Sequence, residues 1–246
     1  MAPVLFKCPL FTIYTYGAFV ALAFLVCVPL WARAASRRGL DGERITTLGL
    51  VLLASGIAGA RLLYVALDWE DFAGDWLEIA RLYHGGLAWF GGLLGAGAAL
   101  VVYARRQRWK VAVVLDTVAP FAALGQGIGR IGCFFNGCCH GFPVAWGLYF
   151  QSAGMRLFPS QLLDAATLGL AALFLARRLR EERPAGTVFA WYLVLAGLQR
   201  FLMEFIRGDM RPYYFGLSVF QWMALAVMAA GVAMLAGRRR WHNAAA

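Results

Sequence analysis

The sequence predicts an all-α integral membrane protein, a single polytopic domain over residues 1–246 with about seven transmembrane helices. Composition is the first observation behind this prediction. Hydrophobic residues make up 61% of the chain, charged residues only 15%, and the mean hydropathy is +0.65. An ordinary soluble domain is about half apolar and roughly a quarter charged, so the excess apolar surface is expected to face lipid.

The second observation is the length and continuity of the apolar runs. They are continuous and roughly twice as long as the ~10-residue alternating strands of a membrane barrel, and helices satisfy their own backbone hydrogen bonds in lipid. The first run is too long for a signal-peptide core, and only Lys7 precedes it. In chain order, the seven runs of spanning length are Phe11–Trp31, Thr46–Leu67, Gly85–Ala104, Val111–Ile128, Ser160–Ala176, Gly186–Ile206 and Gly216–Gly237.

The third observation is where the basic residues lie. Fifteen of the 23 Lys and Arg residues fall between alternate pairs of runs or after the last one, whereas the loop between runs two and three is acidic. Cytoplasmic loops are the basic ones, so the N-terminus is expected outside and the C-terminus in the cytoplasm. This clustering sets topology and argues against a nucleic-acid partner. The fifteen are Arg33, Arg37, Arg38, Arg44, Arg105, Arg106, Arg108, Lys110, Arg177, Arg178, Arg180, Arg183, Arg238, Arg239 and Arg240.

Some charges interrupt the apolar runs themselves. Arg61, Arg200 and Glu204 lie inside runs, and Arg207 ends one; a charge at mid-bilayer costs roughly 2.5–3.5 kcal/mol. The spacing of Arg200, Glu204 and Arg207 predicts a single helical face. Two arginines against one glutamate leave a positive charge. Either the three form an internal brace, or a phospholipid phosphate neutralises them, since arginine can bind phosphate oxygens bidentately.

Two glycine-rich segments stand out. GQGIGRIGCFFNGCCHG, Gly125–Gly141, carries Arg130 and predicts irregular backbone that lines a wet cavity or forms a structural re-entrant loop. GGLAWFGGLLG, Gly85–Gly95, predicts close packing of membrane helices through small residues.

Several motifs occur in the order typical of one bacterial family. They are IYTYG at Ile13–Gly17, GIAGARLLYV at Gly56–Val65, DTVAP at Asp116–Pro120 followed by GRIG at Gly129–Gly132, PSQLLD at Pro159–Asp164 and RFLMEFIRGD at Arg200–Asp209. The sequence thereby resembles the prolipoprotein diacylglyceryl transferases. The resemblance implies a multi-pass protein of the bacterial cytoplasmic (inner) membrane, with its active site toward the outer leaflet. It also implies transfer of the diacylglyceryl group of phosphatidylglycerol to the lipobox cysteine of a lipoprotein precursor, with release of glycerol phosphate.

The resemblance also implies residue roles. Arg130, Arg200 and Arg207 would hold the lipid phosphate, with Arg61 supporting them. Tyr16 would orient the head group, and Glu204 would position Arg200 and Arg207. The remaining predicted substrate-binding positions are Gly129, Asn136, Gly141 and Gln161.

Other family positions differ. The histidine regarded as the family's base is Phe90 here, and His84, six residues earlier, is not equivalent. The family signature GRIGNFINGE reads GRIGCFFNGCC here, with Cys133 in place of its asparagine and Cys138 in place of its glutamate, so the chain resembles a divergent, cysteine-containing branch. Two further replacements are Tyr14 for an arginine and Phe158 for a histidine.

The predicted catalytic set therefore also includes Cys133, Cys138, Cys139 and His140. His140 can deprotonate a thiol, or it can be a loop residue that faces water. An enzyme cysteine suits acyl transfer through a thioester, which leaves open a thiol-dependent phospholipid acyl transferase with another thiol or hydroxyl acceptor.

A thiol–disulfide oxidoreductase and a non-enzymatic lipid-binding protein or transporter also remain open. No metal and no cofactor is expected, because adjacent ligands suit a tetrahedral zinc site poorly. Cys8 and Cys27 are expected to be unremarkable small apolar residues.

Overall fold

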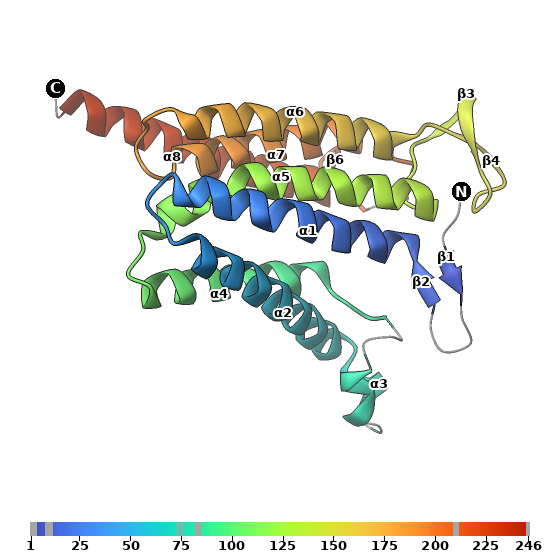
Figure 1. The fold of residues 1–246 in the computed structure, drawn as a ribbon. Helices are drawn as coiled ribbons and strands as arrows, with labels where there is room; N and C mark the ends of the chain where they lie inside the picture. The colour runs from blue at the N-terminus through green and yellow to red at the C-terminus, as the bar shows by residue number, and fades with distance from the viewer. Residues whose placement is uncertain are drawn as a thin grey trace. The chain divides into compact units, whose positions relative to one another are not determined.

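A computed structural model describes residues 4–7, 12–72, 74, 76–81, 85–208 and 212–244 (Figure 1). Cys8 and His84 lie outside the described residues. The chain is helical, with short hairpins at the helix ends, and seven helices have 18 to 26 residues. In order, the elements are β1 (Val4–Lys7), β2 (Thr12–Tyr14), α1 (Thr15–Ser36), α2 (Gly42–Leu67), α3 (Trp69–Phe72), η1 (Trp76–Ala80), α4 (Trp89–Arg106), α5 (Val111–Asn136), β3 (Pro143–Phe150), β4 (Met155–Leu157), α6 (Ser160–Arg180), α7 (Thr187–Glu204), β5 (Tyr213–Tyr214), β6 (Leu217–Ser218) and α8 (Val219–Ala244).

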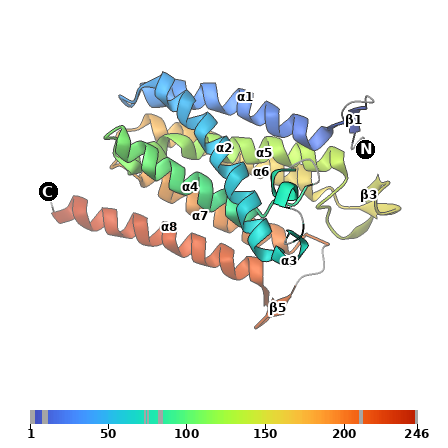
Figure 2. The ribbon, with the colours of Figure 1, turned by 90° about the horizontal axis from the view of Figure 1, so that it is seen from below.

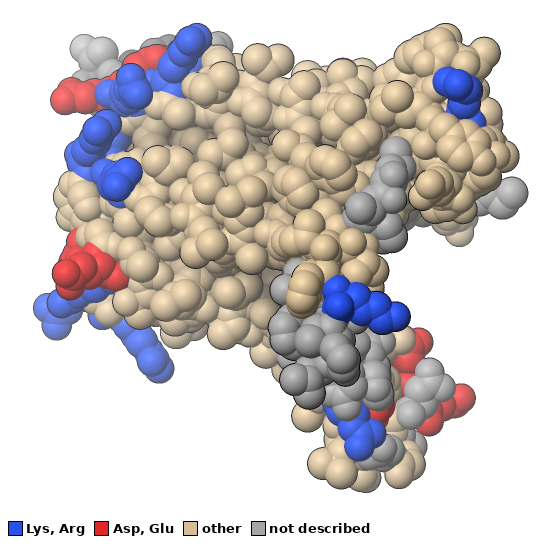
Figure 3. Space-filling view, turned by 45° about the vertical axis from the view of Figure 1, so that its right-hand side comes forward, with Lys and Arg blue, Asp and Glu red and all other residues tan. Residues whose placement is uncertain are grey.

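The all-α prediction is confirmed, and each predicted run overlaps one long helix. Within the described residues, four helices are long and apolar enough to cross a membrane: α1, α2, α5 and the Val219–Gly237 part of α8. On the face shown in Figure 3, charged side chains gather toward the helix ends and leave long uncharged stretches between them. This distribution is typical of helices surrounded by lipid.

The chain divides into two compact units, one of Ala32–Val114 and the other of Met1–Trp31 with Leu115–Ala246. In the first unit, α2 and α4 pack through glycines. A Cβ atom added to Gly95 would lie 2.5 Å from the Ser55 carbonyl oxygen, and one added to Gly59 or Gly91 would collide with the other glycine's carbonyl. The predicted small-residue packing of Gly85–Gly95 is confirmed for its helical part.

The second unit contains α5, α6, α7, α8 and the first part of α1. Figures 1 and 2 show α8 running lengthwise beside α7, and Gly197 and Gly231 allow this approach, since a Cβ on either would meet a carbonyl oxygen at 2.6 or 2.7 Å. The Trp31 indole donates a 3.0 Å hydrogen bond to Thr117 Oγ1 and ties α1 to α5. The Asp116 carboxylate accepts backbone N–H groups at the start of α7, which complements the helix dipole.

The prediction of irregular backbone over Gly125–Gly141 is wrong for most of that segment, because α5 continues to Asn136. Two glycines of this helical part, Gly127 and Gly132, allow close packing instead. A Cβ added to Gly132 would lie 2.8 Å from Phe19 Cβ, and one added to Gly127 would lie 3.3 Å from the Ala165 carbonyl oxygen. Neighbouring helices thus hold the glycines in helical conformation, and only the five residues after Asn136 are irregular.

Candidate functional site

Three arginines act on one buried carboxylate in the second unit. Arg130 Nε on α5 lies 3.2 Å from Asp164 Oδ2 on α6. Arg207 and Arg200 also interact electrostatically with this carboxylate, which is 2% exposed, and Gln199 donates a hydrogen bond to its Oδ1 atom. Asp164 was not among the residues with a predicted role. Its acidic side chain near the start of an apolar run was the signal that could have identified it.

A second ion pair lies along the end of α7. Arg200 Nη2 is 2.8 Å from Glu204 Oε2, as the spacing predicted. Glu204 is buried and accepts a 2.8 Å hydrogen bond from Ser218 Oγ, while the Arg200 guanidinium stacks 5.0 Å from the centre of the Phe220 ring. Glu204 therefore links α7 to β6, because its carboxylate binds both the Arg200 guanidinium and the Ser218 hydroxyl.

The predicted single helical face is wrong for Arg207. The helix ends at Glu204, because the N–H groups of Phe205 and Ile206 bond back to carbonyls three residues earlier and tighten the last turn. Arg207 then forms an isolated β-bridge with Gly141. The extended backbone brings the Arg207 side chain beside Asp164 and Cys139.

The charge balance of this cluster is positive. Arg130, Arg200 and Arg207 stand against Asp164 and Glu204, a net charge of +1 over these five side chains. The side chains of Arg130 and Arg200 remain 26% and 27% exposed. Guanidinium groups that are oriented by carboxylates yet still accessible are suited to binding a phosphate.

Three cysteines cluster beside the arginines. The sulfur atoms of Cys133, Cys138 and Cys139 all lie within 4.8 Å of one another, and no disulfide joins the cysteines in the part of the chain that the structure describes. Hydrogen bonds from Cys133 and Cys138, together with the Arg207 cation, lower the pKa of Cys139 against the opposing effect of burial. The structure thus gathers the three predicted thiols, although Cys133 lies on α5 and the others follow it.

Gln161 is completely buried beneath the same loop. Its amide donates a 2.6 Å hydrogen bond to the Cys138 carbonyl, and Ser160 donates one of 3.0 Å to the Cys139 carbonyl. Among the described residues, the Oε1 atom of Gln161 is the buried side-chain oxygen without a hydrogen-bond partner. Such an atom can accept a hydrogen bond from a ligand hydroxyl.

Tyr16 lies in the first turn of α1 and faces this end of α5. A Cβ added to Gly132 would lie 3.5 Å from a carbon of the Tyr16 ring, and Tyr16 interacts electrostatically with Cys133 and Arg130. Its side chain is 45% exposed. Tyr16 therefore lies beside Arg130, and its role in orienting the head group stays a prediction.

His140 is not part of the cluster that the three thiols form. Its ring packs edge-on against Phe150 at 5.4 Å, and its Nδ1 atom lies 3.4 Å from the Gly141 carbonyl oxygen. Gly141 is a packing position, since a Cβ there would lie 2.7 Å from the Ile206 carbonyl oxygen. Gly129 has open space where its Cβ would be, and the half-buried Asn136 ends α5.

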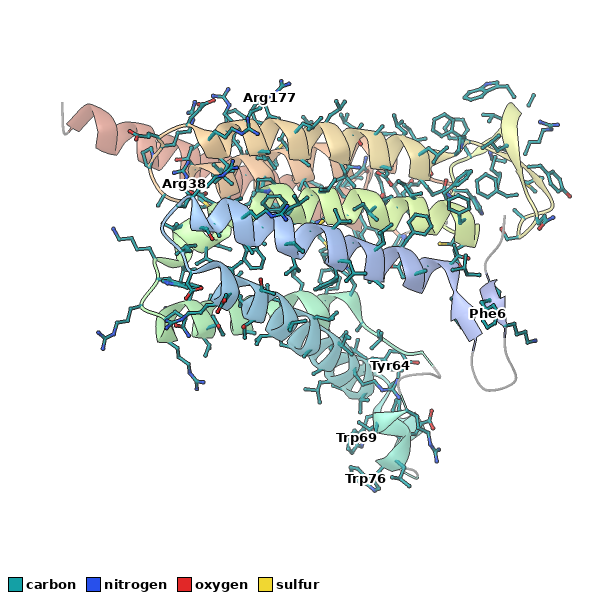
Figure 4. The ribbon with its side chains drawn as sticks, in the orientation of Figure 1. Phe6, Arg38, Tyr64, Trp69, Trp76 and Arg177 are labelled. Atoms are coloured by element: carbon teal, nitrogen blue, oxygen red, sulfur yellow. The ribbon has the colours of Figure 1, made fainter. Side chains whose placement is uncertain are left out.

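Arg61 and Phe90 belong to the other unit. The buried Arg61 guanidinium donates to the backbone carbonyls of Glu78, Ile79, Gly85 and Gly86. It also stacks on Phe72 and Tyr64, at 5.1 and 5.8 Å from the ring centres. Figure 4 shows Tyr64 on α2 near the aromatic segment of Trp69 and Trp76. Phe90, in the first turn of α4, is 43% exposed.

The chain has long apolar helices and, among them, a cluster of arginines and carboxylates with a net positive charge. These features are typical of a helical membrane protein with a polar site among its helices. The comparison with known families identifies the same family as the motifs of the sequence. The sequence profile of the prolipoprotein diacylglyceryl transferases matches residues 3–237, and the chain belongs to this family.

Individual relatives match over most of their length. The chain is 34% identical to a phosphatidylglycerol–prolipoprotein diacylglyceryl transferase of Clostridium tetani over 239 residues, which cover 94% of this chain and 96% of the relative. It is 37% identical to the enzyme of that name from Synechococcus elongatus, over 79% of this chain and 73% of the relative. The corresponding enzyme of Geobacter sulfurreducens is 36% identical, over 83% and 82%.

Proposed function

We propose that this protein transfers the diacylglyceryl group of phosphatidylglycerol to the thiol of a lipobox cysteine in a lipoprotein precursor. The names of its relatives give the donor and the acceptor. The observation that carries the proposal is the net positive cluster of Arg130, Arg200 and Arg207 around Asp164 and Glu204. A phospholipid phosphate would neutralise it.

The reaction needs charge stabilisation at one oxygen. The acceptor thiolate attacks the glyceryl carbon, a C–S bond forms, and the C–O bond to phosphate breaks with its electron pair on that oxygen. The leaving glycerol phosphate gains one negative charge, and preorganised guanidinium groups stabilise such charge as it develops. Asp164 and Glu204 keep Arg130 and Arg200 oriented before the lipid binds.

The acceptor thiol must also lose a proton, because the thiolate is the nucleophile. Phe90 has no group that can accept it, so in this chain the proton leaves by a route other than the family's histidine position. Gln161 stays a predicted substrate-binding residue, and its buried Oε1 atom has no hydrogen-bond partner among the described residues.

For the membrane arrangement, we propose that all seven long helices cross the bacterial inner membrane as one polytopic domain. The basic loops would then be cytoplasmic. In this arrangement Tyr16, the end of α5 and the arginine cluster would lie toward the outer leaflet, where lipoprotein precursors emerge.

The first test mixes purified protein in phosphatidylglycerol vesicles with a lipobox peptide and measures the peptide's mass. We expect the peptide to gain one diacylglyceryl group. Arg130→Ala should slow transfer about 10²–10³-fold, the usual effect of removing one preorganised donor. Arg177→Ala serves as the matched control, because Arg177 is exposed and lies in the last turn of α6, at the opposite end of that helix from Asp164 (Figure 4). Full activity in Arg130→Ala would show that the proposed phosphate site is wrong.

A further inference from the structure

The thiol cluster has a geometry that the proposed transfer reaction does not use. In the family reaction the attacking thiol belongs to the peptide, so the protein's own Cys133, Cys138 and Cys139 have no assigned step. Their three sulfur atoms lie within 4.8 Å of one another. Four-coordinate zinc with metal–sulfur distances of about 2.3 Å places its sulfurs roughly 3.8 Å apart. The cluster would therefore need to contract only slightly around an ion.

Local backbone conformation produces this convergence. Adjacent cysteines are poor candidates for a shared ion in regular backbone, because their side chains diverge. Here Gly137 has a φ of 74° and Cys139 a φ of 62°, so the chain reverses after α5. A left-handed φ is uncommon for a residue other than glycine, and such conformations concentrate at functional sites.

The surrounding side chains hold the loop in this conformation. Ser160 and Gln161, both 0% exposed, donate hydrogen bonds to the carbonyls of Cys139 and Cys138. The Cys138 N–H and thiol both point back to the Cys133 carbonyl, at 3.3 and 3.7 Å. The cluster is thus braced by groups outside it, as the outer residues of metal sites brace their ligands.

Charge also favours an ion at this position. Three thiolates around Zn²⁺ carry a net charge of −1, and around Cu⁺ a net charge of −2. Arg207 lies beside Cys139 and offsets this negative charge. Thiolates prefer soft or borderline cations such as these.

We propose that Cys133, Cys138 and Cys139 form a three-thiolate site for a thiophilic d¹⁰ cation, Zn²⁺ or Cu⁺. The ion would replace the thiol protons and join the end of α5 to the loop that follows it. That loop continues into Gly141, whose backbone pairs with Arg207. Ion binding would therefore rigidify the extended segment that carries Arg207, one arginine of the phosphate site.

The test uses untagged full-length protein in detergent, reduced and freed of metal by a chelator. One arm titrates Co²⁺, a spectroscopic substitute for Zn²⁺, followed by displacement with Zn²⁺. The other arm titrates Cu⁺ against a chromophoric copper chelator. We expect one ion per chain in at least one arm, with sulfur-to-metal charge-transfer absorption. Cys133→Ser, Cys138→Ser and Cys139→Ser should each weaken binding by about tenfold or more.

Cys27→Ser is the matched control, because Cys27 is a buried cysteine of α1 outside the cluster. It should bind the ion as the unaltered protein does. A second readout is the thermal midpoint, which the ion should raise in the unaltered protein but not in the triple serine variant.

The proposal is overturned if neither ion binds better to the unaltered protein than to the triple variant. A disulfide within the cluster of protein isolated without reductant, with no ion bound, would also overturn it. Neither lipid nor peptide is present, so the result is independent of the transfer assay.

Discussion

Arg61 and Arg130 are both arginines on apolar helices, and they have different kinds of partner. Arg61 donates to four backbone carbonyls of the segment between α2 and α4. Arg130 faces a carboxylate and shares it with two further arginines. The Arg61 guanidinium uses its donors to hold backbone carbonyls, whereas the five described side chains around Arg130 carry a net charge of +1. Burying a charge in an apolar helix costs free energy for both arginines, so this cost does not distinguish their roles. The partners of the guanidinium group indicate whether such an arginine has a structural or a ligand-binding role.

The largest effect that would test this contrast is on stability. Arg61→Leu should lower the free energy of unfolding by about 2–4 kcal/mol, because several part-buried carbonyls lose their donors. The measurement is thermal unfolding in detergent, with limited proteolysis between α2 and α4. Arg61→Lys should recover little, since an ammonium cannot span the same carbonyls. Unchanged stability with weaker lipid binding would instead place Arg61 in the phosphate site.

The opposite test addresses the carboxylate that orients Arg130. Asp164→Asn should lower the transfer rate about tenfold to a hundredfold, because small displacements of positioned groups are costly. The isosteric amide keeps the shape of the side chain. A rate equal to that of the unaltered protein would mean that Asp164 only balances charge. Glu181→Gln, an exposed carboxylate after α6, is the control.

The glycine contact between α2 and α4 predicts a smaller effect. Gly91→Val should destabilise the protein by about 1–3 kcal/mol through overpacking, since even a Cβ atom at this position collides with α2. Gly97→Ala on the same helix meets nothing within 4 Å and should leave the thermal midpoint unchanged or slightly raised. Equal midpoints in the two variants would contradict the close contact.

The smallest predicted effect concerns the group that deprotonates the acceptor thiol. Phe90→His restores the histidine of the family position, and a correctly placed base should raise the transfer rate about tenfold, below its usual full contribution. The gain should appear as pH rises through the ordinary histidine pKa near 6.5, where the neutral imidazole can accept a proton. Phe90→Gln is the polar control. A pH-independent gain would point to polarity instead of proton transfer.

Hydropathy predicted the seven helices because lipid-facing segments must be locally apolar along their whole length. The Arg200–Glu204 pair was predicted for a similar reason, as it joins residues one turn apart. Prediction from local spacing failed three residues after Glu204, at Arg207, because the helix ends at Glu204. It also failed at Gly125–Asn136, where neighbouring helices keep a glycine-rich segment helical.

The sequence by itself determined the helical class, the positions of the helices and the arginines of the family motifs, because these depend on properties that are read within one or two turns. Only the tertiary structure decided what the arginines contact. Asp164 reaches Arg130 from another helix, and Cys139 meets Cys133 only because its backbone adopts a left-handed conformation. Such contacts depend on how helices pack and where chains reverse, and neither is encoded by the residue types at the contact alone.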